Sequence, residues 1–192
     1  MTTLGFCQRL GLSVLLLSLG ACAAAIVGGT VGGASVASDS RTTGSLVEDK
    51  AIQIKAGSLI DNEPNIAQGT RINVYSYNQQ VLVTGQAVNE ADKARVLELV
   101  RSVAKVRLVR DYIKVGPASS LSERGRDTVL EAQIRTAYVG LKDFDFTRIQ
   151  IVCEQGVAYL LGLVDQETGK RAAATASTVT GVRRVVVLFE YQ

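Results

Sequence analysis

The 192-residue chain carries the same order of hydrophobic and polar patterns twice. Residues 72–85 and 149–162 each open with alternating apolar and polar positions, turn through the polar tips "YNQ" or "EQG", and return as a second apolar run. Alternation with a period of two on both sides of a polar tip predicts a β-hairpin. Because the two stretches align, the sequence indicates a duplicated unit.

A helical pattern and then a further apolar strand follow each hairpin. After the first hairpin, apolar residues recur at the spacing of one helix face: Val96, Leu97, Val100 and Val103. The equivalent segment after the second hairpin, residues 166–179, carries a thinner stripe of alanines. The copies then end in residues 102–115 and 178–191, which resemble each other and predict the last strand of each unit.

Another helix is predicted before each hairpin. Its apolar pattern is moderate around Ile52, Leu59 and Ile60, and it is clearer over residues 127–138, where Asp127 is expected to be the N-cap.

Each copy therefore reads α-β-β-α-β over roughly 70 residues. A helical crossover returns the last strand to the same sheet, parallel to one of the other two strands. The predicted fold class is α+β, with two tandem units, each a three-stranded mixed sheet covered on one face by two helices. We assign the units to residues 46–115 and 126–192, with residues 116–125 as the linker.

The N-terminal segment has the pattern of an export signal. Arg9 precedes an apolar run over residues 10–19, which is too short to cross a hydrocarbon core of ~30 Å. The following "LGAC" ends at Cys22 and resembles the bacterial lipobox, in which the cysteine becomes acylated. We expect residues 1–21 to be a signal peptide, Cys22 to be the lipid attachment point, and residues 22–45, rich in Gly, Ala, Ser and Thr, to be a flexible tether. The alternative is an ordinary signal peptide with an incidental cysteine.

Composition removes several classes of function. The chain has no histidine, which excludes Ser-His-Asp and Cys-His catalysis and any histidine-ligated metal. A net charge of +3 without a basic, aromatic-rich stripe argues against nucleic acid. Cys153 shares strand parity with apolar neighbours and is expected in the core. Asp143 and Asp145 lack further ligands at calcium-loop spacing, so they predict a loop. We expect no enzyme activity, no cofactor and no metal.

Each copy resembles a BON domain, whose hallmark is a hairpin ending in "L.G.V", a helix, and then "v.GV..V". The second copy has "LGLV" at residues 161–164 and "VTGVRRV" at residues 179–185. The first copy has Ala104-Lys105-Val106 where Gly-Val is expected, so we expect its turn to differ. A lipobox followed by two such units resembles the dual BON-domain outer-membrane lipoproteins.

That resemblance implies a location and a function. Ala23, directly after Cys22, implies sorting to the outer membrane, with the protein facing the periplasm. The family implies a non-enzymatic protein that binds anionic phospholipid of the phosphatidylglycerol type, supports envelope integrity and gathers at the division site. It also implies that the lipid-contacting surface centres on the first helix of the second BON domain.

That helix can be divided into two faces. At ~100° per residue, Leu130, Ile134, Ala137 and Tyr138 form one stripe, which is expected to face the sheet. Val129 falls off that stripe, at the position where the family carries an aromatic residue. The candidate phospholipid-binding residues are Arg126, Val129, Leu130, Ala132, Gln133, Arg135 and Thr136.

The sequence leaves the function open between two classes. Val129 can also be a scattered surface apolar residue, and acidic and basic residues are equal in number over residues 121–192. The arginines of "VRRVV", residues 182–186, are expected to be a solvated pair. The second hypothesis is therefore a protein-interaction scaffold for outer-membrane assembly, peptidoglycan-remodelling or division-site proteins.

Overall fold

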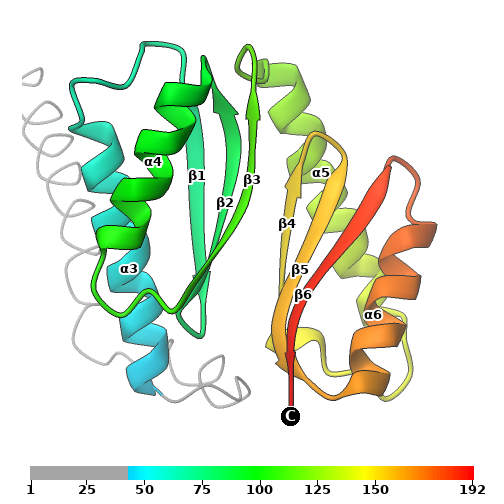
Figure 1. Cartoon of the computed structure of the whole chain (residues 1–192). Coiled ribbons are helices and arrows are strands. Elements are labelled where there is room, and N and C mark those ends of the chain that lie inside the picture. Colours follow the sequence, from blue (N-terminus) through cyan, green and yellow to red (C-terminus); the bar gives the residue numbers. More distant parts are fainter. Residues whose placement is uncertain (1–42) are drawn as a thin grey trace, which may run out of the picture. The chain divides into compact units, whose positions relative to one another are not determined.

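A computed structural model describes residues 43–192, in which two α-β-β-α-β units follow one another (Figure 1). The predicted signal peptide, Cys22 and most of the predicted tether lie outside the described residues. None of the helices within residues 43–192 has the length and apolar character needed to cross a membrane.

The first unit contains helix α3 (Thr43–Asp61), strands β1 (Arg71–Tyr77) and β2 (Gln80–Ala87), helix α4 (Glu90–Ser102) and strand β3 (Leu108–Val115). Helix α3 begins inside the segment predicted as tether, so residues 43–45 belong to the folded unit. Asn89 is the N-cap of helix α4, because its side chain accepts a hydrogen bond from the backbone N–H of Asp92.

The second unit contains helix α5 (Leu121–Val139), a short 3₁₀ turn η1 (Phe146–Arg148), strands β4 (Ile149–Glu154) and β5 (Val157–Val164), helix α6 (Gln166–Thr178) and strand β6 (Arg184–Tyr191). The prediction that α5 begins at Asp127 is wrong. Ser120 is its N-cap, in a capping box with Glu123, so the second half of the predicted linker is the first part of this helix.

Each unit forms the mixed three-stranded sheet that was predicted. Strands β1 and β2, like β4 and β5, pair antiparallel around a two-residue turn. The last strand of each unit pairs parallel with the central strand, giving the orders β1-β2-β3 and β4-β5-β6. The helical crossover produces this parallel pairing, as the sequence pattern requires.

Two apolar cores lie between the helices and the sheets. The first joins the inner face of α3 and α4 to β2, and includes the predicted helix residues Val96, Leu97, Val100 and Val103. The second joins α5 and α6 to β4 and β5. The predicted inner stripe of α5 is confirmed there by Leu130, Ile134 and Tyr138, all buried. The helices of each unit cover one face of its sheet (Figure 1).

The other faces of the two sheets pack against each other. A third cluster joins Tyr77 and Leu82 of the first sheet to Val152, Tyr159 and Leu161 of the second. Tyr112 meets Tyr159 edge-to-face, with ring centroids 4.8 Å apart. The central strands β2 and β5 are therefore covered on both sides, and the order of layers is helices, sheet, sheet, helices.

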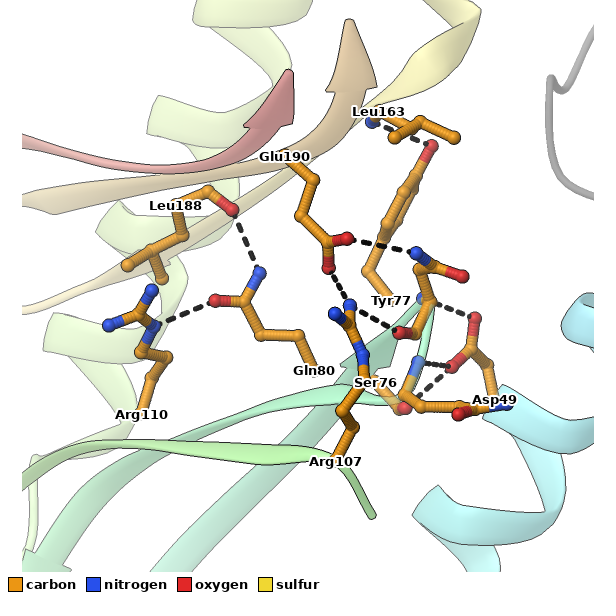
Figure 2. A network of polar contacts seen from close by, with 11 residues as sticks. Asp49, Ser76, Tyr77, Gln80, Arg107, Arg110, Leu163, Leu188 and Glu190 are labelled. Atoms are coloured by element: carbon orange, nitrogen blue, oxygen red, sulfur yellow. Dashed lines mark hydrogen bonds and ion pairs between the residues drawn. The ribbon is translucent and has the colours of Figure 1, made fainter. Parts of the chain in front are cut away.

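Polar side chains complete this interface (Figure 2). Gln80, only 2% exposed, donates to the carbonyl of Leu188 at 3.0 Å and accepts from Arg110 at 2.7 Å. Tyr77 donates its hydroxyl to the carbonyl of Arg148 at 2.9 Å. Since buried polar groups are costly unless hydrogen-bonded, these bonds fix the register of one sheet on the other.

Candidate functional site

Helix α5 presents a continuous outer face that is partly apolar. Leu121, Ala132 and Val139 fall within about 20° of one another around the helix, and Val129 lies about 80° away. All four are exposed: Leu121 at 80%, Val139 at 65%, Val129 at 56%, and Ala132 in the same class. The face therefore carries a discontinuous strip of exposed aliphatic side chains, with exposed polar residues such as Thr128 and Thr136 between them, on a helix whose opposite stripe is buried.

Arginines border this strip. Arg126 lies about 60° to one side of Val129, and Arg135 lies about 120° to the other. Both are exposed. Apolar side chains between cations that keep their charged ends in water are typical of helices that lie in a membrane interface.

Most of the predicted site residues lie on this outer face, and one does not. The exposed candidates are Arg126, Val129, Ala132, Gln133, Arg135 and Thr136. Leu130 is only 5% exposed and packs in the core of the second unit, so it lies beneath the face rather than on it. Sequence reasoning missed Leu121 and Val139, because the predicted helix began after the first and ended before the second. The capping-box residues Ser120 and Glu123 were the signal for the earlier start.

Asp127 has a different role from the predicted N-cap. It is 7% exposed, in the middle of α5, and its carboxylate accepts from the backbone N–H groups of Gln155 and Gly156, each at 2.8 Å. These amides belong to the β4–β5 turn, where both residues have positive φ. Asp127 therefore ties the turn of the hairpin to the helix.

A groove runs along one side of the outer face. It has a volume of about 890 Å³ and lies between α5, the β4–β5 turn and the loop that joins α6 to β6. Its lining includes Val129, Leu130, Gln133, Gly156 and Gly181. It also contains two arginines, Arg126 and Arg183. The prediction of a plain solvated pair is therefore incomplete for Arg183, since tertiary packing brings it beside the helix.

Two carboxylates also line the groove, and both are engaged elsewhere. Asp127 holds the β4–β5 turn, as described. Glu123 accepts from the backbone N–H and the hydroxyl of Ser120, each at 2.7 Å. These hydrogen bonds, and then the charges of Arg126 and Arg183, hold the pKa of Glu123 below its usual value.

The turn before β3 and the turn before β6 have similar backbone conformations despite their different sequences. Lys105 has φ 69° and Gly181 has φ 101°, so both occupy the left-handed region. In both copies the arginine two residues later donates its backbone N–H to the hairpin turn, Arg107 to Gln79 and Arg183 to Gly156. The expectation that the first turn differs is wrong in conformation, and the difference is confined to its side chains.

The residues set aside as structural have the expected surroundings. Cys153 is buried in the second core with Ile149 and Ile151, and burial raises the pKa of its thiol to about 12. Asp145 accepts from the backbone N–H of Thr147 as the cap of η1. Within residues 43–192, no cluster of His, Cys, Asp or Glu is suited to hold a metal ion.

The family model described as BON domain matches residues 48–117 and 126–192. The chain belongs to the BON-domain family. It is 32% identical over 170 residues to outer membrane lipoprotein DolP of Haemophilus influenzae, covering 88% of each chain.

Two further relatives are more distant. The chain is 23% identical over 153 residues to the 21 kDa hemolysin of Actinobacillus pleuropneumoniae, covering 80% of this chain and 79% of that one. It is 26% identical over 156 residues to osmotically-inducible protein Y of Escherichia coli, covering 80% and 77%. The match to two BON domains agrees with the two mixed sheets and confirms the fold that the sequence predicted.

Proposed function

We propose that this BON-domain protein is an outer-membrane lipoprotein of the DolP type that binds anionic phospholipid through the outer face of α5. Acylated Cys22 would anchor it, facing the periplasm, and its role would be to support envelope integrity at the division site. It would act by binding and not by catalysis. The similarity to DolP over nearly the whole chain supports the anchor and the location.

The single observation that most supports the proposed lipid binding is the exposure of Val129. Its side chain is 56% exposed in the middle of a helix whose other stripe is buried in the core. Leu121 and Val139 extend the apolar strip in both directions, and Arg126 and Arg135 border it. A surface of this composition gains free energy by entering the headgroup region of an anionic bilayer.

A weak contact is enough for this function. An acyl anchor at Cys22 keeps α5 close to the bilayer, so its binding becomes an intramolecular event at a high effective concentration. We therefore expect modest affinity of the isolated α5 face and strong attachment of the acylated protein.

The test is co-sedimentation of residues 23–192, which contain the whole described fold but not Cys22, with vesicles. Phosphatidylglycerol-containing vesicles are compared with purely zwitterionic ones, for the parent and for Val129→Glu. Losing valine burial costs about 1 kcal/mol and placing a charge near the anionic surface about 1 kcal/mol more. The expected loss of affinity is about 30-fold.

Ala174→Glu is the matched control, because it adds the same charge at an exposed position of α6, away from the α5 face. We expect this control to bind as the parent does within about twofold. Binding that is equal on both kinds of vesicle, or equal for Val129→Glu and the parent, would contradict the proposal.

The second candidate, a protein-interaction scaffold, is supported by the outer face of α3. Val47 is 64% exposed and Ile54 is 62% exposed, on the same side of that helix. Because the paired sheets separate the two helix layers, this face points away from α5. Loss of envelope function in Val47→Glu with unchanged vesicle binding would favour docking of an outer-membrane protein.

A further inference from the structure

We propose that the groove beside α5 is a phosphate site that holds the phosphodiester of an anionic phospholipid between Arg126 and Arg183. This inference rests on the proposed lipid binding and deepens it, because it adds a defined headgroup site to an apolar contact. It also assigns a role to the loop between α6 and β6, which the outer face of α5 does not include.

The groove brings together two cations from distant parts of the chain. Arg126 comes from α5, and Arg183 comes from the turn before β6. The guanidinium of Arg183 donates to the carbonyl of Gln155 in the β4–β5 turn, which holds it against the groove. No ion pair joins either arginine to a carboxylate within 4.0 Å among the described residues. Guanidinium groups without such a partner are suited to binding the oxygens of a phosphate.

The carboxylates of the groove do not cancel these charges by direct pairing. Asp127 is held by two backbone N–H groups, and Glu123 accepts two hydrogen bonds from Ser120. Both are thus committed to the fold. Ser122, Thr180 and Gln133 line the same groove and can donate further hydrogen bonds to a phosphodiester.

The duplication within the chain provides an internal comparison. The hydrogen bonds of Asp49 to the first hairpin turn match those of Asp127 to the second, so Glu48 is the equivalent of Arg126. In the first unit Glu48 forms an ion pair with Lys105, across the place that corresponds to the groove. In the second unit these two positions are Arg126 and Gly181. The bridging pair is replaced by a cation and a residue without a side chain, which leaves the space open.

The arginine that follows this turn also has different surroundings in the two copies, and again the second copy leaves its side chain available. Arg107, the equivalent of Arg183, forms an ion pair with Glu190 at the interface between the two sheets (Figure 2). Arg183 instead lies at the outer side of its unit, beside α5. The same backbone position therefore stabilises the domain interface in one copy and is available to a ligand in the other.

The position of the groove suits a lipid already contacting α5. Val129, which is also exposed on the outer face of α5, and Leu130 both line the groove. A phospholipid whose phosphate lies between the two arginines would have its acyl chains beside the exposed strip of α5. The volume of about 890 Å³ is in the range of sites that take ligands of this size.

The test uses residues 23–192 and vesicle co-sedimentation with three variants. Arg183→Gln and Arg126→Gln each remove one cation, and each should weaken binding to phosphatidylglycerol vesicles about fivefold. The double variant Arg126→Glu/Gly181→Lys transplants the ion pair of the first unit and should lose both attraction and space, giving a larger loss. Lys170→Gln is the matched control, since it removes one positive charge from an exposed position of α6 outside the groove.

The outcomes separate this inference from the proposed function. If Val129→Glu loses binding while all three groove variants and Lys170→Gln bind alike, α5 contacts lipid but the groove is not a headgroup site, and the inference is overturned. If the parent does not bind anionic vesicles, the proposed function fails and the inference fails with it. Thermal unfolding of each variant identifies any loss of vesicle binding that comes from misfolding. This control matters most for Gly181→Lys, because Gly181 has φ 101°, a conformation that favours glycine.

The source of the phosphate is distinguished by amide NMR. Free glycerophosphoglycerol should shift the amide signals of Gly156 and Gly181 in the parent and not in Arg183→Gln. If inorganic phosphate shifts these signals while the groove variants keep full vesicle affinity, the groove binds a free anion and not a lipid, which also overturns the inference.

Discussion

Replacing Asp127 by alanine should destabilise the second unit through the β4–β5 turn. The carboxylate accepts from the backbone N–H groups of Gln155 and Gly156, both at 2.8 Å, from a position that is 7% exposed. A hydrogen bond to a charged group contributes about 1.5–3 kcal/mol. The turn itself is partly exposed, so water recovers some of this loss, and we expect about 3 kcal/mol for Asp127→Ala.

Asp127→Asn should reduce the free energy of unfolding by less than Asp127→Ala does. Its side-chain carbonyl can accept from one of the two amides, while its NH₂ group faces the other, so the expected cost is about 2 kcal/mol. Thr128→Ala, at an exposed neighbouring position on the same helix, is the control and should cost less than about 0.5 kcal/mol.

Urea unfolding measures these free energies, and hydrogen exchange at the amides of Gln155 and Gly156 reports the turn directly. We expect exchange at these two amides to accelerate in Asp127→Ala. A cost below about 1 kcal/mol for Asp127→Ala, or equal costs for the alanine and asparagine variants, would refute this account of the turn.

Val129→Trp should strengthen binding of residues 23–192 to anionic vesicles about fivefold or more, because tryptophan buries more apolar area and donates its N–H in the interface; co-sedimentation measures this. Gly57→Ala should stabilise α3 by about 1 kcal/mol, since a Cβ there meets nothing within 4 Å. Gly85→Ala should instead prevent folding, since its Cβ would lie 2.1 Å from the carbonyl oxygen of Arg71. Thermal unfolding measures the effect of both substitutions. Burial raises the pKa of Glu131 in the folded state, so the free energy of unfolding falls as pH rises from the ordinary carboxyl pKa through this raised pKa. Glu131→Gln, which does not titrate, should therefore gain stability relative to the parent over that rise in pH, as urea titrations would show.

The elements of each unit could be predicted because local pattern determines them. The hairpins around Asn78 and Gln155, the inner stripe of α5 at Leu130, Ile134 and Tyr138, and the parallel last strands all follow from periodicity and from the handedness of crossovers. The start of α5 was also encoded locally, in the capping box of Ser120 and Glu123, but the glycine at position 125 and the polar residues before it resemble a linker.

The pairing of the sheets was harder to predict because its polar residues resemble a solvent-facing strand side. Gln80, Thr84 and Gln86 alternate with apolar residues in β2, yet each is at most 2% exposed. The signal lay in β5, whose uninterrupted run of apolar residues in the sequence indicates a strand covered on both faces.

The groove could not be predicted from local pattern at all. Arg183 is distant in sequence from Arg126, and no periodicity links the loop before β6 to α5. The two line the same groove because Asp127 ties α5 to the β4–β5 turn, and Arg183 bonds to that same turn.

The most direct test of the central claim is the membrane depth of position 129. In residues 23–192 the only native cysteine is Cys153, which is buried with a pKa raised to about 12, so an environment-sensitive fluorophore can be attached selectively to Val129→Cys. Ala174→Cys on α6 and Val47→Cys on α3 serve as matched reporters. The account predicts that only the probe at position 129 shifts to the blue with phosphatidylglycerol vesicles and is quenched by spin-labelled lipid. A probe at position 129 that stays in water while the protein is vesicle-bound would contradict it.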